Sequence, residues 1–328
     1  MRQISSSTAA TRPVVGAGLM LLASLAFAGT NILQSVLPWQ FGMSSTGMAF
    51  WQYLVATVFA LPLILRIGLK NLRTRHPLLH ELRAFVSALG IHVFVYGFAA
   101  GAPIWQMVTL LSTGPLFIVL GSALFLGERV SPTRLVAALL GFGGAILVSG
   151  VGTDGLSWLT LVPIAAALLW ATTDVLTKYL LREDTPETLT LSLLVLITPN
   201  HLLILIVATS WAWLAPTLVP SGLATGFPFQ LPAGAGLLLL VLLGVLTAGA
   251  QYLASMAYRV ADAVYLQPFT DLKLPLSAVL GWVLLSQVPT IWFWPGAALI
   301  ICASAFILQR EARASTAKLI DETVVTAA

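Results

Sequence analysis

The chain has 328 residues, of which 58% are hydrophobic and only 9% are charged, and its mean hydropathy is +0.95. Soluble domains carry about 25% charged residues, so this composition excludes a soluble enzyme and a nucleic-acid-binding domain and indicates an integral membrane protein. The formal net charge of +4 therefore bears on membrane orientation rather than on a nucleic-acid partner. The one cysteine, Cys302, excludes an internal disulfide and a cysteine-rich metal site.

Ten stretches of the chain are long and apolar enough to cross a membrane. A transmembrane helix needs roughly 20 mainly apolar residues to cross about 30 Å of hydrocarbon. The stretches are continuous rather than alternating, which favours helices over the strands of a barrel. The sequence thus predicts an all-α integral membrane protein with ten transmembrane helices. In chain order the stretches are 14–37, 45–65, 82–98, 103–126, 133–150, 157–179, 188–211, 233–257, 263–285 and 290–308.

The lysine and arginine residues predict the orientation of these helices. Fifteen of the sixteen lie in the two tails or at alternate connections, whereas the opposite set of connections contains none. Basic residues concentrate on the cytoplasmic side of membrane proteins. We therefore expect a multi-pass protein of the cell inner membrane whose N-terminal tail, 1–13, and C-terminal tail, 310–328, are both cytoplasmic. The sixteenth basic residue, Lys273, lies within the ninth predicted span.

Two parts of the chain repeat. Residues 23–37 match residues 166–180 at a constant offset of 143, with shared Ala, Leu and Thr positions. Residues 115–124 match residues 275–284 at an offset of 160, with six of ten positions identical, including a proline and a glycine. The first five spans and the last five therefore look like two copies of one unit.

The two copies span residues 14–150 and 157–309. Because each copy has an odd number of spans, the second must enter the membrane from the opposite side. The sequence therefore predicts two inverted five-helix repeats. Inverted repeats of this kind are typical of secondary transporters, in which they exchange conformations around a central site.

The run PLFIVLGSALFLGERVSPTRLVAALLGFGGAILVSG at 115–150 resembles the end of an EamA-type repeat of the drug/metabolite transporter superfamily. The Gly-Glu-Arg signature of that repeat begins at Gly127, whereas the second copy has Ser286-Gln287 where Gly-Glu is usual. The resemblance covers about 14–311. It implies a ten-span transporter of a small organic metabolite: an amino acid or a derivative of one, a nucleoside-like compound or a vitamin-like compound.

Three ionisable residues lie deep in predicted spans: Asp174, Asp271 and Lys273. Such groups are costly in hydrocarbon and usually face the bundle interior or a water-filled cavity. Two interpretations of Lys273 stay open. Either it meets a substrate carboxylate or a proton-linked acid in the cavity, or it forms an interhelical ion pair, for example with Asp174. We expect Lys273 in or beside the cavity. The family that the sequence resembles often has a basic residue near this position, which favours the same placement.

Asn31 and Asp174 occupy matching positions of the two repeats. They are interpreted either as polar positions on one pathway, on opposite sides of the midplane, or as helix-packing residues. On the third span, His92 and Tyr96 share one helix face. A membrane histidine is a candidate proton relay, with satisfied packing as the alternative. The resemblance implies that the third span lines the cavity, which favours His92 over His201.

The fourth predicted span carries Thr113-Gly114-Pro115, where the proline leaves a backbone carbonyl without its helical partner. That carbonyl either coordinates a solute or only marks a kink. Aromatic and amide side chains on other spans suit a flat or amphiphilic organic solute, or they simply pack. The complete set of predicted substrate-binding residues is Asn31, His92, Tyr96, Gln106, Thr113, Trp170, Asp174, Gln251, Tyr252, Tyr265, Gln267, Asp271 and Lys273.

The leading functional hypothesis is a secondary transporter that moves a small organic metabolite across the inner membrane by alternating access. The alternatives are an intramembrane enzyme, which the scattered acids and histidines disfavour, and a channel, which is more usually a symmetric oligomer. We expect no cofactor, no metal and no nucleic-acid partner. The expected partners are the metabolite, the lipid bilayer and a proton as candidate coupling ion, and the protein is expected to be a monomer or a weak homodimer.

Overall fold

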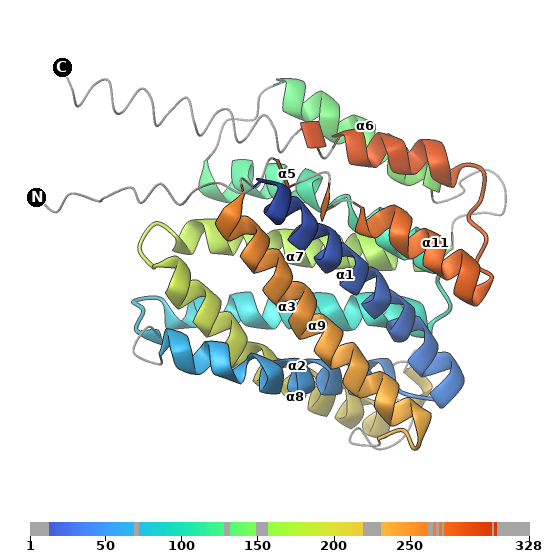
Figure 1. Cartoon of the computed structure of the whole chain (residues 1–328), viewed down its shortest axis with the longest axis horizontal. Coiled ribbons are helices and arrows are strands. Elements are labelled where there is room, and N and C mark those ends of the chain that lie inside the picture. The colour runs from blue at the N-terminus through green and yellow to red at the C-terminus, as the bar shows by residue number, and fades with distance from the viewer. Residues whose placement is uncertain are drawn as a thin grey trace, which may run out of the picture.

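The computed structural model describes residues 13–68, 72–127, 132–148, 157–218, 231–261, 265–266, 269–270, 272–303 and 305–306. Within these ranges the regular structure consists of helices alone (Figure 1). The elements are α1 (Pro13–Phe41), α2 (Ser45–Ile67), α3 (Pro77–Ala99), α4 (Ile104–Leu111), α5 (Gly114–Leu126), α6 (Pro132–Val148), η2 (Trp158–Thr160), α7 (Leu161–Leu180), α8 (Pro186–Leu214), η3 (Pro216–Leu218), α9 (Ala235–Val260) and α11 (Lys273–Leu285). A further apolar helix covers Phe293–Ala303.

Among the described residues, seven helical segments are long and apolar enough to cross a membrane. They are α1, α2, α3, α4 with α5, η2 with α7, α8, and α9. Three shorter apolar helices, Leu135–Val148, Lys273–Leu285 and Phe293–Ala303, lie where the fifth, ninth and tenth spans were predicted. The all-helical membrane architecture is therefore confirmed, whereas the number of ten spans stays a prediction.

Helices α1 and α3 extend beyond their predicted ends. Helix α3 begins at Pro77 rather than at residue 82, and α1 continues to Phe41 rather than ending at residue 37. Proline has a preset φ and lacks only an N–H that the first turn leaves unbonded. The first turns of α3 contain His80 and Glu81, so a search for apolar residues alone excluded them.

The helices pack as pairs across the bundle. Helices α1 and α9 lie side by side across the face nearest the viewer in Figure 1; α9 also packs against α2, and α1 against α3. Helix α3 packs against α7 and α8, α5 packs against α7, and α11 packs against α1 and α4. Helix α6 and the helix Phe293–Ala303 lie together at one edge. Segments far apart in sequence therefore form the interior together.

Two glycines permit the contact at that edge. A Cβ atom on Gly144 of α6 would lie 2.7 Å from the carbonyl oxygen of Gly296, and a Cβ atom on Gly296 would lie 2.8 Å from the carbonyl oxygen of Gly144. No other residue fits at such distances, because the neighbouring atoms belong to the backbone. Small residues let membrane helices approach closely enough for favourable van der Waals packing.

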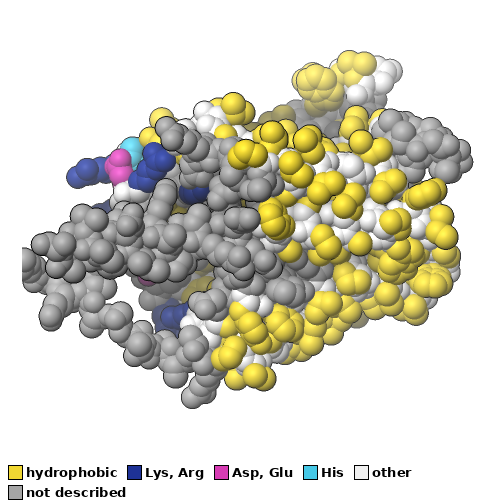
Figure 2. Space-filling model, turned by 90° about the horizontal axis from the view of Figure 1, so that it is seen from above, with side chains coloured by type: hydrophobic (Ala, Val, Ile, Leu, Met, Phe, Trp, Pro, Cys, Tyr) yellow, Lys and Arg dark blue, Asp and Glu magenta, His cyan; other side chains and the backbone are white. Residues whose placement is uncertain are grey.

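The outer surface of the bundle is apolar, and its charges gather at one end. Phe125, Leu238 and Val283 are each more than 70% exposed, as expected for side chains that face lipid. Figure 2 shows Lys and Arg side chains at one end of the molecule and hydrophobic side chains over most of the rest of that face. We call this end, which includes Arg73 and Arg182, the basic end, and the other the opposite end.

The two short helices α5 and α11 end in the same way although their sequences differ. Gly127 follows α5 with φ of 70°, and its N–H bonds to the carbonyl of Ser122. Ser286 follows α11 with φ of 57°, and its N–H bonds to the carbonyl of Gly281. Both residues adopt the left-handed conformation that glycine favours at a helix C-terminus. The serine therefore occupies this position at a conformational cost.

We expect Ser286→Gly to stabilise the protein by about 1 kcal/mol, because glycine adopts the left-handed conformation without a Cβ clash. The reverse change at the equivalent cap, Gly127→Ser, should destabilise it by a similar amount. Thermal unfolding of the purified protein in detergent measures both effects. Equal melting temperatures for Ser286→Gly and the wild type, together with a decrease for Gly127→Ser, would contradict this account of the Ser286 cap.

Candidate functional site

Buried hydrogen bonds between polar side chains join the helices in the middle of the bundle. Asn31 of α1 donates from Nδ2 to Oγ of Ser277 of α11 at 3.0 Å, and both residues are at least nine-tenths buried. The pair therefore connects the first helix of the chain to α11. Asn31 was predicted as a site residue, and the structure places it in the interior rather than against lipid.

A second connection uses uncharged amides. Gln34 Nε2 donates to Gln52 Oε1 at 3.0 Å, and Gln52 Nε2 donates to Oγ1 of Thr247 at 2.9 Å, which links α1, α2 and α9. The Gln34 Oε1 atom is buried without a hydrogen-bond partner among the described residues. The sequence analysis missed these three residues because it considered ionisable groups first. An amide within an apolar span was the signal that could have found them.

Trp170 of α7 lies between two hydrophobic clusters of the interior. One contains Ile32 and Phe94 and the other contains Leu33 and Leu240, and the indole packs against both. Its Nε1 donates to the backbone carbonyl of Ser87 at 3.2 Å. The partly exposed indole is therefore held in one orientation in the interior of the bundle.

Gly90 of α3 leaves the space that the Trp170 indole occupies. A Cβ atom at Gly90 would lie 2.7 Å from Trp170 Nε1. The approach of α3 to α7 thus depends on the absence of a side chain at this position.

The two histidines that the sequence analysis compared lie in contact. His92 Nε2 of α3 is 3.0 Å from His201 Nδ1 of α8, and both rings are buried. The ring of Tyr53 of α2 stacks on His201 with centroids 4.4 Å apart. The sequence analysis favoured His92 over His201 as a site residue, whereas in the structure the two side chains form one contact. Their partnership could not be predicted because α3 and α8 are more than 100 residues apart.

The structure gives three other predicted residues different surroundings. Gln106 Nε2 donates to Thr160 Oγ1 at 3.2 Å. Thr113 is fully buried at the break between α4 and α5, and its hydroxyl donates to the carbonyl of Leu110 at 2.7 Å. Tyr96 is buried beside Trp158, and its hydroxyl has no partner among the described residues.

The other described residues of the predicted set lie closer to the surface. Asp174 is exposed on α7, one turn beyond Trp170, and the charge of Arg83 acts on it. Lys273 is partly buried and is the first residue of α11 rather than the middle of a continuous span. The structure does not bring three aromatic or amide residues of the set into the interior, namely Gln251, Tyr252 and Tyr265. Gln267 and Asp271 lie outside the described residues.

Two cavities of different character lie between described helices. The larger, about 450 Å³, is lined by apolar side chains and Cys302, with Leu140 and Leu299 on its walls, as expected for a groove filled by lipid. The smaller, about 320 Å³, lies at the opposite end and combines the indole of Trp39 with Ser35, Gln40 and Gln287. Its mixed lining suits an amphiphilic solute, so it is the better candidate for an entrance to the site.

Gln287 also fixes the wall of the smaller cavity. Its Oε1 accepts a hydrogen bond from the backbone N–H of Ile104 at 2.8 Å, so it satisfies one of the free N–H groups at the start of α4. Gln287, which replaces the glutamate of the usual Gly-Glu pattern, thus joins the start of α4 to the segment that follows α11.

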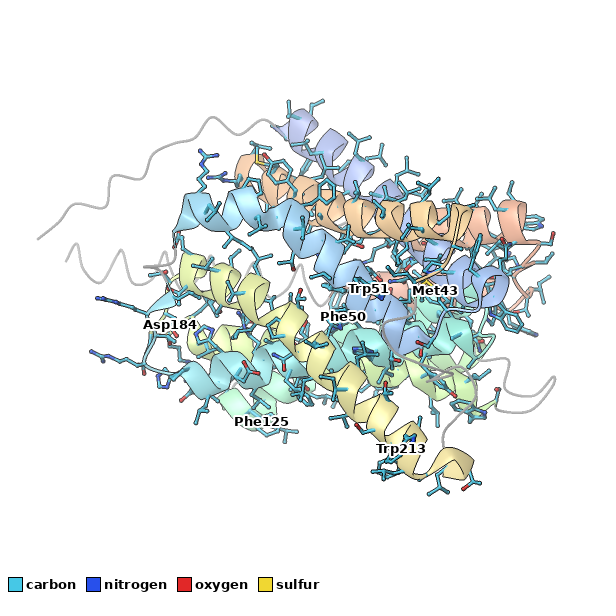
Figure 3. The ribbon with its side chains drawn as sticks, turned by 90° about the horizontal axis from the view of Figure 1, so that it is seen from below. Met43, Phe50, Trp51, Phe125, Asp184 and Trp213 are labelled. Carbon is cyan, nitrogen blue, oxygen red and sulfur yellow. The ribbon has the colours of Figure 1, made fainter. Side chains whose placement is uncertain are left out.

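A polar cluster joins α3, α7 and α8 at the basic end. Asp184, in the loop between α7 and α8, lies at this end in Figure 3. Its Oδ2 is 2.9 Å from His80 Nε2 and accepts from the Thr74 hydroxyl at 2.8 Å. His80 Nδ1 in turn is 2.7 Å from Ser192 Oγ. Burial raises the pKa of Asp184, but the hydrogen bonds from His80 and Thr74 and the charges of His80 and His76 outweigh it, so the pKa lies below its usual range.

Arg83 extends the same cluster into the bundle. It donates to Ser192 Oγ at 3.1 Å, to Thr177 Oγ1 at 3.2 Å and to the carbonyl of Leu189. Asp174 lies near enough to interact with its charge. Arg83 therefore connects the basic-end cluster to a predicted site residue. Among the described residues, no three His, Cys, Asp or Glu side chains gather closely enough to hold a metal ion.

Comparison with known proteins identifies the family. The model of the EamA-like transporter family matches residues 14–150. A riboflavin transporter of Rhizobium johnstonii is 43% identical over 95% of this chain and 97% of its own length. The chain belongs to the EamA-like transporter family. It is a multi-pass membrane protein of a transporter family and not an enzyme.

Further relatives extend the comparison. A riboflavin transporter of Brucella anthropi is 40% identical over 90% of this chain and 99% of its own length. An S-adenosylmethionine uptake transporter of Rickettsia bellii is 25% identical over 93% of this chain and 97% of its own length. One solved crystal structure covers 86% of this chain and 95% of its own, with a TM-score of 0.52 and 20% identity; it supports the fold alone.

We expect the Asp184 carboxylate to stabilise the folded protein at neutral pH. A carboxyl group whose pKa is lowered on folding stabilises above its unfolded pKa of about 3.9, and this contribution is lost as the pH falls through the folded-state pKa. Asp184→Asn should therefore destabilise the protein at pH about 7, by about 1–3 kcal/mol, but not at a pH below the folded-state pKa.

Thermal unfolding at both pH values measures this difference. Glu183→Gln is the matched control, because the Glu183 side chain is half-exposed and contacts the partly exposed His76. A destabilisation by Asp184→Asn that is equal at both pH values would show that the carboxylate charge is not the cause.

Proposed function

We propose that this protein is a secondary transporter that carries riboflavin, or a closely related planar metabolite, by alternating access. The observation that carries this proposal is the identity of about 40%, over nearly the whole chain, with riboflavin transporters from more than one genus. The three relatives also match along almost their entire lengths, so the likeness includes both halves of the molecule rather than one repeat.

The chemistry of the bundle interior supports a flavin as substrate. Riboflavin combines a flat ring system, which carries hydrogen-bond donors and acceptors, with a hydroxylated chain. The indole of Trp170 offers a surface for stacking, and Asn31 and Gln34 offer amide groups in the same interior. Because these groups are uncharged, they suit a neutral solute better than a bare ion.

The packing of the helices supports two inverted repeats within residues 14–150 and 157–309. If α1, α2 and α3 correspond to α7, α8 and α9, the contacts of one half recur in the other. Helix α1 packs on α9 as α7 packs on α3, α2 packs on α9 as α8 packs on α3, and α5 packs on α7 as α11 packs on α1. Such an arrangement is consistent with ten spans related by an axis in the membrane plane.

The interrupted helices support a site between the repeats. Helix α5 begins at Gly114 and α11 begins at Lys273, which correspond to within one residue at the offset of 160 found in the sequence. Interrupted helices at corresponding positions mark the central substrate sites of many secondary transporters. In this proposal the basic end faces the cytoplasm of the inner membrane, with both tails on that side.

A second candidate substrate is S-adenosylmethionine, which is cationic at its sulfonium and carries a carboxylate. The accessible Asp174 and the partly buried Lys273 would complement these two charges. The lower identity with the relatives of that name, 25%, makes this the second choice.

We expect proteoliposomes that contain the purified protein to exchange external labelled riboflavin for internal riboflavin. Trp170→Ala should reduce the exchange rate by about tenfold or more, which corresponds to roughly 1.4 kcal/mol of lost substrate interaction. Trp211→Ala, on the exposed surface of α8, is the matched control and should retain wild-type exchange. Exchange of S-adenosylmethionine but not riboflavin by the wild type would select the second candidate, and exchange of neither would refute both.

Lys273→Met should lower transport without unfolding the protein, because the charge at the start of α11 would be lost while the volume stays similar. If Lys273 faces the substrate, the variant should melt like the wild type and disfavour anionic solutes relative to neutral ones. If it belongs to an ion pair instead, the variant should melt at a lower temperature, and a second change, Asp174→Asn, should restore stability. Wild-type flux of each tested solute would mean that Lys273 has no role in transport.

A further inference from the structure

The contact between His92 and His201 has no assigned role, although it lies deep in the bundle. Each histidine follows the first residue of its helix by fifteen residues, or roughly 22 Å along the axis. His92 is 4% exposed and His201 is 0% exposed. Two titratable rings thus meet where polar groups are costly and are usually functional.

The surroundings of the pair contain few other groups that titrate. From α2, the Tyr53 ring stacks on His201. On α3, Tyr96 lies one turn beyond His92 with a buried hydroxyl. On the other side, Asn200 precedes His201 and donates from Nδ2 to Oε1 of the exposed Glu81 at 3.0 Å. The charged groups of α3 and α7, Arg83 and Asp174, interact with each other rather than with the pair.

The geometry of the contact constrains the protons on the two rings. A neutral imidazole has one N–H donor and one acceptor nitrogen. A hydrogen bond between His92 Nε2 and His201 Nδ1, 3.0 Å apart, therefore uses the donor of one ring and the acceptor of the other. The two outer nitrogens, His92 Nδ1 and His201 Nε2, must then be one free acceptor and one free N–H.

Both outer nitrogens are buried, and neither has a hydrogen-bond partner among the described residues. A contact that served only to join α3 and α8 would leave two polar atoms unsatisfied, at a cost that an apolar pair of similar size would avoid. An arrangement with one bare acceptor at one side and one N–H at the other is, however, what a proton relay needs.

We propose that the His92–His201 pair is the proton-coupling site of transport. This inference rests on the proposed transport function and adds the coupling ion and its position. A proton binds to the bare outer nitrogen of one ring, the bridging proton moves across to the facing nitrogen of the other ring, and the outer N–H of that second ring releases its proton. One proton enters and one leaves, no charge remains on the pair, and the bridging hydrogen bond is reversed.

Polar residues flank the pair on both helices. On α8, Asn200 precedes His201 and donates to Glu81 of α3, and on α3 the buried Tyr96 hydroxyl lies one turn beyond His92. In this proposal these residues mark the direction of the route toward each end. Helices α3 and α8 belong to different halves of the chain, so a change in their relative position would open or break the contact. That dependence couples the movement of a proton to the conformational change that moves the substrate.

The test uses the full-length protein in liposomes that contain a pH-sensitive dye. Exchange of labelled for unlabelled riboflavin at equal pH on both sides tests the transport function alone. Net riboflavin entry, followed with the dye, then tests coupling. We expect the wild type to change the internal pH as riboflavin enters, and His201→Gln to lower this change to about one tenth or less while exchange persists. Glutamine keeps a donor and an acceptor but takes up no proton near neutral pH.

His76→Gln is the matched control, because His76 lies in the cluster at the basic end and contacts Glu183 rather than the pair. It should behave as the wild type in both assays. Net riboflavin entry by the wild type without a pH change would overturn the inference, and this result requires no variant to fold. A wild-type pH change in a folded His201→Gln protein would overturn it as well.

If the wild type does not exchange riboflavin, the proposed substrate fails and the pair is tested by nitrogen NMR instead. The chain has only four histidines, so the signals of the pair can be assigned by comparison with His201→Gln and His76→Gln. A pair that relays protons should populate both tautomers of each ring between about pH 5 and about pH 8. One fixed tautomer at every pH would identify the pair as a packing contact.

Discussion

The structure depends on the absence of water from the hydrocarbon core of a membrane. In that environment each backbone N–H and C=O must be bonded within its own helix, and a polar side chain has to find its partner inside the bundle. Asn31 with Ser277, and Gln52 with Gln34 and Thr247, follow this rule. The interior polar contacts therefore do more than hold helices together, because they determine which helices can be neighbours.

The same constraint explains where the regular structure is interrupted. Between α4 and α5 the chain leaves the helical pattern, and the Leu110 carbonyl accepts from both the backbone N–H and the hydroxyl of Thr113. At the start of α4 the amide of Gln287 has a comparable role. Such interruptions are tolerated in a membrane only where nearby groups satisfy the backbone, so they lie in the interior of the bundle.

The polar contacts fall into two groups that differ in charge. Amides, hydroxyls and an indole occupy the middle of the bundle, where a neutral planar molecule could replace their partners at little electrostatic cost. Charged groups gather at the basic end, where Asp184, His80 and Arg83 tie the loop between α7 and α8 to α3. The His92–His201 pair is buried apart from the charged groups of the basic end, and in the proposal above it is the place where a proton passes through the interior.

The amino-acid sequence was enough to predict the membrane class, the helical architecture and the approximate position of each long helix, because hydrocarbon thickness and helix rise set the length of an apolar run. It also pointed to Asn31, His92 and Trp170, since a polar or aromatic residue in such a run is visible without a structure. The partners of these residues depend on how the helices pack in three dimensions. His201 faces His92 from more than 100 residues away, Ser277 faces Asn31, and Thr113 turns back to its own helix. Helical periodicity says which residues share a face, but the face that meets each neighbour depends on how all the helices pack together.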